Sequence, residues 1–111
     1  MTAIFTDRDV SLCQRADGLS VQGDVDVTSA AALAAEGSRW LAAHHPAAIT
    51  FDFSEVDTPR NVALSVLLQW LRICHQHRIN VISITLSAPL MRLAELAELD
   101  ALINAPGEKP V

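Results

Sequence analysis

The stretch Phe51–Leu71, FDFSEVDTPRNVALSVLLQWL, decides the fold. It opens with the end of an alternating run over residues 48–53, whose large apolar side chains point to one side, and this period of two predicts a central strand. A short charged loop follows, and then a long apolar segment that continues to His77 with helical periodicity. A strand that leads through a tight loop into a long helix indicates an α/β domain built around this junction.

Two starts compete for the helix within this stretch. Thr58 could be the N-cap with Pro59 at the first helical position, or Asn61 could be the N-cap after a Thr-Pro-Arg turn. Local chemistry favours Thr58, because proline suits the first helical position. Either start places the N-terminus of the helix within a few residues of the end of the strand.

Alternating runs predict further strands on both sides of the junction. The runs at residues 10–14 and 19–22 flank an Asp-Gly pair, and glycine accepts the positive φ that a hairpin turn needs. We therefore expect these two runs to pair antiparallel. Residues 80–86 (NVISITL) alternate again. One face of that run carries Ile82, Ile84 and Leu86.

Two more helices are predicted. An alanine-rich segment follows Thr28 and Ser29, both good N-cap residues, and runs to about His44. Gly37 within it weakens the helix or permits the close approach of a neighbour. A last helix follows residues 87–89 (SAP), where proline lies near the first helical position.

The predicted order of elements is hairpin, helix, strand, helix, strand, helix. This order implies an α/β fold, with a mixed sheet of about four strands and three helices packed against it. The 111 residues form a single domain, since a chain of this length supports one core. We expect that core at residues 10–103, with flexible ends at 1–9 and 104–111.

Composition excludes several classes of protein. The net charge is −5 and the basic residues are scattered, which argues against a nucleic-acid partner. Apolar runs are far shorter than the ~20 residues needed to cross a bilayer, so we expect no membrane insertion. The first residues lack the features of a secretory signal, which predicts a cytoplasmic protein. Cys13 and Cys74 are interpreted as small, buried or half-buried apolar side chains that form no disulfide framework.

The motifs of catalysis are not found, so we expect no enzyme activity and no cofactor. The sequence contains neither a phosphate-binding glycine loop nor a nucleophile elbow. Cys74 and His77 lie one helical turn apart but supply only half of a four-ligand zinc site, so no metal is expected. A small hydrolase using Asp52 or His75 is a remote alternative. The junction carries the carboxylates Asp52, Glu55 and Asp57, interpreted as solvated charges near a helix N-terminus.

The long helix after the junction is apolar on two sides. One side, which would cover the sheet, carries Leu64, Leu67, Leu68, Leu71 and His75. The nearly opposite side carries Val62, Val66, Trp70 and Ile73. This second side either wedges between neighbouring helices or remains exposed as an interaction site with an aromatic anchor. We favour the interaction site.

Several of these segments together resemble the STAS domain. They are FDFS at residues 51–54, the following apolar helix, NVISITL, SAPLMRLAELAELDALI, and GDVD at residues 23–26. The resemblance covers residues 10–103 and is strongest to the MlaB-type subunits of Mla phospholipid ABC transporters. It implies a non-catalytic subunit that binds and regulates the cytoplasmic ATPase of such a transporter, maintains outer-membrane lipid asymmetry, and is peripheral to the inner membrane through that partner. The alternative is an anti-sigma-factor antagonist that binds a kinase-like anti-sigma factor.

The start of the long helix departs from the family pattern. STAS domains usually have Asp followed by Ser or Thr there, and this hydroxyl is the phosphorylation site of the anti-sigma-factor antagonists. Arg60 and Asn61 occupy those positions, and asparagine cannot be phosphorylated. Thr58 and Ser65 are nearby, but their spacing does not carry the role onto them. The predicted partner-binding residues are Arg60, Asn61, Val62, Ser65, Val66, Gln69 and Trp70.

Overall fold

The computed structural model describes residues 2–104. The elements are β1 (Thr2–Asp7), β2 (Val10–Gln14), β3 (Gly18–Gly23), α1 (Val27–His44), β4 (Ala48–Glu55), α2 (Asn61–Gln76), β5 (Asn80–Leu86), α3 (Ala88–Leu96) and α4 (Asp100–Asn104). The strands form one mixed sheet in the order β1-β2-β3-β4-β5. β1, β2 and β3 pair antiparallel, whereas β3, β4 and β5 pair parallel. The predicted α/β class is confirmed, with one more strand and one more helix than expected.

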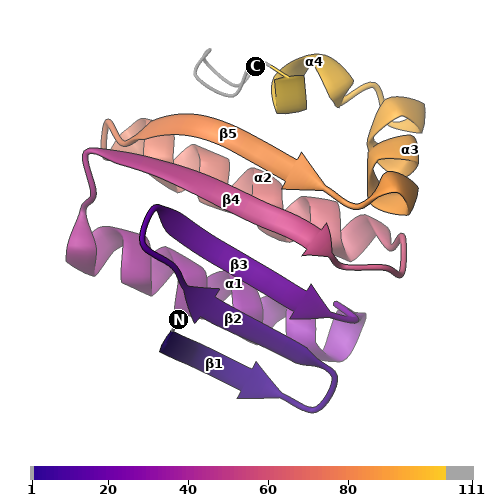
Figure 1. Ribbon diagram of the computed structural model, residues 1–111, viewed down its shortest axis with the longest axis horizontal. Helices are drawn as coiled ribbons and strands as arrows, with labels where there is room; N and C mark the ends of the chain where they lie inside the picture. Colours follow the sequence, from indigo (N-terminus) through magenta and orange to yellow (C-terminus); the bar gives the residue numbers. More distant parts are fainter. Residues whose placement is uncertain (1, 105–111) are drawn as a thin grey trace.

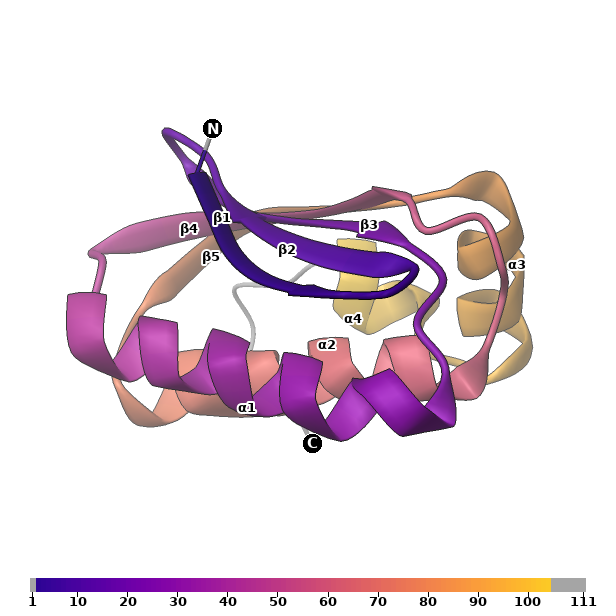
Figure 2. The ribbon, with the colours of Figure 1, turned by 90° about the horizontal axis from the view of Figure 1, so that it is seen from below.

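Both long helices, α1 and α2, cover the same face of the sheet, while no helix among the described elements covers the opposite face (Figures 1 and 2). α3 and α4 lie beyond the β5 edge (Figure 1). Because β3, β4 and β5 run in the same direction, their carboxyl ends meet at one edge of the sheet. The N-termini of α1 and α2 lie at that same edge, which is where α/β folds usually place binding sites.

The core lies between β4 and the two long helices. Ile49, Phe51 and Phe53 are buried, as the alternation of this strand predicts. The ring of Trp70 on α2 lies 5.7 Å, centroid to centroid, from the rings of both Phe51 and Phe53. The strand pairs with β3 on one side and β5 on the other, so its predicted central position is confirmed.

β1 is the strand that the sequence prediction missed. Residues 2–7, expected in a flexible end, pair with β2 from Thr2 opposite Gln14 to Asp7 opposite Val10. The register shifts between Ala3 and Phe5, and such a bulge breaks the alternation that reveals a strand in sequence. Of the other predicted flexible end, Asn104 is the last residue of α4 and residues 105–111 lie outside the described part.

A second irregularity corrects the predicted face of β5. Val81 pairs with Ile49 but Ser83, not Ile82, pairs with Thr50, so Ile82 is the extra residue of a bulge. Its side chain is 59% exposed, whereas Val81 is buried. The prediction that Ile82 shares one face with Ile84 and Leu86 is therefore wrong, because the bulge shifts the side-chain period by one residue.

Both long helices begin elsewhere than predicted. Asp26, and not Thr28 or Ser29, is the N-cap of α1. α2 begins at Asn61, and Arg60 holds the N-cap position without a side-chain cap. The favoured start at Thr58 is therefore wrong, and Asn61 lies just inside the helix. None of the helices within residues 2–104 is long and apolar enough to cross a membrane.

Candidate protein-docking site

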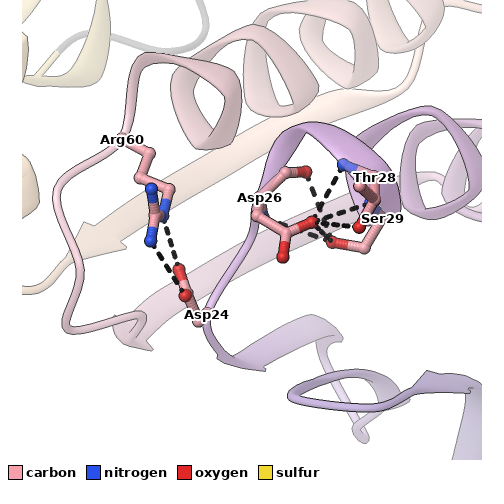
Figure 3. Close-up of polar contacts among 5 residues, drawn as sticks. All are labelled: Asp24, Asp26, Thr28, Ser29 and Arg60. Atoms are coloured by element: carbon pink, nitrogen blue, oxygen red, sulfur yellow. Dashed lines mark hydrogen bonds and ion pairs between the residues drawn. The ribbon is translucent and has the colours of Figure 1, made fainter.

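A bidentate ion pair joins the loops that lead into α1 and α2. The Arg60 guanidinium donates from Nε to Asp24 Oδ1 over 2.8 Å and from Nη2 to Asp24 Oδ2 over 3.2 Å (Figure 3). The hydrogen bond and charge of Asp24 raise the pKa of Arg60 above its ordinary value. Arg60, predicted to contact a partner, thus has a partner within its own chain, and the fork geometry of the pair fixes the two loops relative to each other.

A capping box orders the start of α1 beside this ion pair. Asp26 Oδ1 accepts hydrogen bonds from the backbone N–H groups of Thr28, at 2.9 Å, and Ser29, at 3.0 Å (Figure 3). The Ser29 hydroxyl in turn accepts from the Asp26 N–H at 3.2 Å. The hydrogen bond from the Thr28 hydroxyl, followed by the bonds from Ser29, lowers the pKa of Asp26. The side chains of Asp26 and Ser29 thus each accept a hydrogen bond from the other's backbone N–H group, which stabilises the first turn of α1.

The exposed polar residues of α2 follow the side of the helix that faces α1. Asn61 is exposed at the first position, and its carbonyl accepts a hydrogen bond from the Ser65 hydroxyl at 3.2 Å. Gln69 Nε2, one turn further, donates to Ser38 Oγ on α1 at 3.3 Å. This bond closes the surface between the two helices at that level.

A shallow hollow of about 180 Å³ lies between the N-terminal halves of α1 and α2. We call it the α1–α2 groove. Its walls are Ala30, Ala31 and Ala34 from α1 and Val62, Ser65, Val66 and Gln69 from α2. Val27 is 76% exposed at the first position of α1, on the groove side of that helix by helical spacing. Apolar surface thus extends from the groove to the helix N-termini.

The structure corrects the predicted exposure of Val66 and Trp70. Both side chains are buried, and Trp70 Nε1 donates to the Ala34 carbonyl of α1 at 3.1 Å. The indole lies where a β-carbon on Gly37 would be, so the close approach foreseen for that glycine is confirmed. The second apolar side of α2 packs against α1. Neither Val66 nor Trp70 forms a protruding anchor, while Val62 remains half-buried at the groove.

Asp52 forms a separate polar site on the face of the sheet that α1 and α2 leave open. Its Oδ2 accepts from Arg15 Nη1 at 2.9 Å, and its Oδ1 accepts from the Ser54 N–H at 2.9 Å. Burial raises the pKa of Asp52, but the hydrogen bonds from Ser54 and the charge of Arg15 outweigh this and lower it overall. Asp52 is thus an ionised, paired carboxylate, while Glu55 and Asp57 are exposed.

The cysteine and histidine residues at the end of α2 do not assemble into a metal site. Burial raises the pKa of the Cys74 thiol to about 12, which keeps it protonated. The His77 ring meets His45 edge-on at 5.3 Å, and His75 is exposed. Within residues 2–104, no three His, Cys, Asp or Glu side chains are grouped so that they could hold a metal ion.

Comparison with known families agrees with this architecture. Residues 9–104 match the family model described as MlaB, STAS domain. No curated protein matches the chain. Since the family model covers most of the sequence, the chain belongs to the MlaB-type STAS domains, which are non-catalytic domains for regulation and protein interaction.

Proposed function

We propose that this STAS domain is the subunit of an Mla-type phospholipid ABC transporter that binds and regulates its cytoplasmic ATPase. In this role it does no chemistry itself. It is held at the cytoplasmic face of the inner membrane through the ATPase, and it contributes to outer-membrane lipid asymmetry by keeping the transporter assembled. Arg60, Asn61, Val62, Ser65 and Gln69 form the docking edge, and Val66 lines the α1–α2 groove beside it. Trp70 is buried between α1 and α2 and stabilises the fold without contacting the partner.

The observation that carries this proposal is the ordered pair of helix N-termini. The Arg60–Asp24 ion pair joins the two loops, and Asp26 caps α1, so the edge is organised before any partner arrives. A preorganised surface loses less conformational entropy on binding than a mobile one. The exposed side chain of Asn61 and the adjacent groove then give this surface polar and apolar contacts.

The residue at the start of α2 favours a transporter subunit over an anti-sigma-factor antagonist. Asn61 is exposed where the antagonists carry their phosphorylated hydroxyl, and an amide cannot accept a phosphate. The nearby Ser65 hydroxyl is hydrogen-bonded to the Asn61 carbonyl within the helix. Docking at this edge is therefore constitutive in the proposed function, as suits a permanent subunit.

Co-purification from the native host tests the proposal. Tagged wild-type protein should retain an ABC-transporter ATPase, identified by mass spectrometry. Asn61→Lys should lose the ATPase for two reasons. The longer side chain obstructs the docking edge, and its positive charge lies at the positive end of the α2 dipole. Gln76→Lys is the matched control, since it adds the same side chain at the exposed far end of the same helix.

Each outcome of this experiment decides something. Retention of the ATPase by Gln76→Lys but not by Asn61→Lys supports the docking edge. Equal retention by both variants rejects the edge, and recovery of a kinase-like anti-sigma factor instead of an ATPase rejects the transporter role.

A further inference from the structure

We infer that the α1–α2 groove binds an amphipathic helix of the partner whose basic residues lie over the N-termini of α1 and α2. The identity of the partner rests on the proposed function, but the chemistry of the helix is argued from the groove itself. The groove walls, its length and the charges at its open end each constrain what can lie there.

Small apolar side chains line most of the groove. Val27, Ala30, Ala31 and Ala34 share one face of α1 at the spacing i, i+3, i+4 and i+7. Alanine side chains allow a neighbouring backbone to approach closely, and Val62 and Val66 form the facing wall. Amphipathic helices bind into grooves of this kind, with apolar anchors at the same i, i+3, i+4 and i+7 positions.

The length of the groove suits a short helix. At the far end the Gln69–Ser38 hydrogen bond closes it, and at the near end it opens beside Val27. From residue 27 to residue 38, α1 rises roughly 16 Å, which corresponds to about three turns of an added helix. Beyond their first turns, both groove helices hydrogen-bond their backbone groups internally, so an extended strand would find little to pair with along the groove, whereas a helix needs only side-chain packing.

The open end of the groove is acidic. Asp26 lies there, and two more carboxylates belong to the same edge of the sheet: Glu55, the last residue of β4, which pairs with Gln22 just before the β3–α1 loop, and Asp57 in the loop from β4 to α2. Asp24 is neutralised by Arg60, which leaves the other three carboxylates without an ion pair to any residue within 2–104. The N-terminal dipoles of α1 and α2 oppose this charge with about half an elementary charge each, but their effect falls off within one turn. The full charges therefore dominate, and the complementary partner is basic.

Two designed peptides test this inference without the ATPase. Both carry the same leucine face over three turns, and the end that would cover the groove opening carries lysines in one and glutamates in the other. We expect the lysine peptide to bind about tenfold more tightly, with the difference shrinking as salt is raised. In NMR titrations its methyl shifts should centre on Ala30, Ala31, Ala34, Val62 and Val66.

Matched variants locate the binding. Ala31→Glu places a bulky charge in the groove and should weaken lysine-peptide binding at least tenfold. Ala32→Glu makes the same substitution at the next exposed residue, about 100° around the helix, and should leave binding unchanged. The double variant Glu55→Gln/Asp57→Asn should weaken binding about threefold, as expected for charges at the rim of an interface.

The inference is overturned if both peptides bind equally, if the shifts centre outside the groove, or if Ala31→Glu and Ala32→Glu behave alike. It is also overturned if the wild-type protein is a dimer in sedimentation and Ala31→Glu makes it monomeric, because a second copy would then be the occupant. If the wild-type protein retains no ATPase in co-purification but still binds the lysine peptide, the proposed function is rejected and the groove chemistry stands.

Discussion

The two halves of the interface between α1 and α2 differ in how they are filled. Around Gly37, the Trp70 indole packs directly against the α1 backbone and donates its N–H to the Ala34 carbonyl. Nearer the N-termini, small alanine side chains of α1 face the valines of α2 and leave a hollow of about 180 Å³. We call these the closed half and the open half. The closed half stabilises the fold through this buried contact, whereas the open half leaves the surface where we propose that the partner binds.

The largest expected effect comes from emptying the closed half. Trp70→Ala removes a fully buried side chain that contacts Phe51, Phe53 and α1, and it should lower the free energy of unfolding by about 3–5 kcal/mol. Val62→Ala, a truncation in the open half, should cost about 1 kcal/mol because Val62 is only half-buried. Urea denaturation of both variants measures the difference. Equal losses in the free energy of unfolding would show that the closed half does not stabilise the fold more than the open half does.

Alkaline pH should weaken the closed half through Cys74, which lies one turn beyond Trp70. Burial raises the pKa of this thiol from 9.0 to about 12. The contribution of the protonated Cys74 thiol to the free energy of unfolding is therefore fully present below pH 9. It is lost as the pH rises towards 12, because the unfolded chain releases the proton first. At pH 11 this proton release lowers the free energy of unfolding by about 2–3 kcal/mol. Stability of the wild-type protein and Cys74→Ala, measured from pH 7 to pH 11, should diverge in slope above pH 9; parallel curves would contradict the burial argument.

Overfilling the closed half should also destabilise the fold. Gly37→Ala gains about 1 kcal/mol of helix propensity but places a methyl group against the indole, where overpacking costs about 1–3 kcal/mol. We expect a net loss of about 1 kcal/mol by urea denaturation. The atoms that the methyl group meets are Cε2, Cζ2 and Nε1 of Trp70, and the smaller ring of phenylalanine has no counterpart to Nε1 or Cζ2. In a Trp70→Phe background the Gly37→Ala substitution should therefore become neutral or stabilising, and an undiminished penalty there would show that the close contact is not its cause.

The smallest expected effect lies at the opening of the open half. Asp26→Ala removes the capping box of α1 and should lower the Tm by about 5 °C at neutral pH. Because the hydrogen bonds to its carboxylate lower the pKa of Asp26, the difference from the wild-type protein should be present at neutral pH and disappear as the pH falls below the folded pKa. Asp26→Asn is the control, since asparagine caps nearly as well. A Tm difference that does not shrink as the pH falls through the acidic range would contradict the capping role.

Most of the fold could be predicted from periodicity, and the exceptions have local causes. β1 and the exposure of Ile82 were missed because bulges interrupt the alternation. The docking edge at the start of α2 stays a prediction. The Arg60–Asp24 ion pair beside it links residues 36 positions apart, and no local sequence pattern reveals such a pair. The apolar side of α2 was visible in sequence. That Trp70 is buried and not exposed depends on Gly37 of another helix, which only the packing of α1 against α2 brings together.

The comparison of the two halves is tested most directly by the dissociation constant of the complex with the proposed ATPase partner. Ala31→Glu, in the open half, should weaken this complex at least tenfold while leaving the Tm within a degree or two, because Ala31 is exposed. Trp70→Phe, in the closed half, should lower the Tm but leave the dissociation constant unchanged at a temperature where the variant is folded. If Trp70→Phe instead weakens binding as much as Ala31→Glu, the two halves do not have separate roles and the account is wrong.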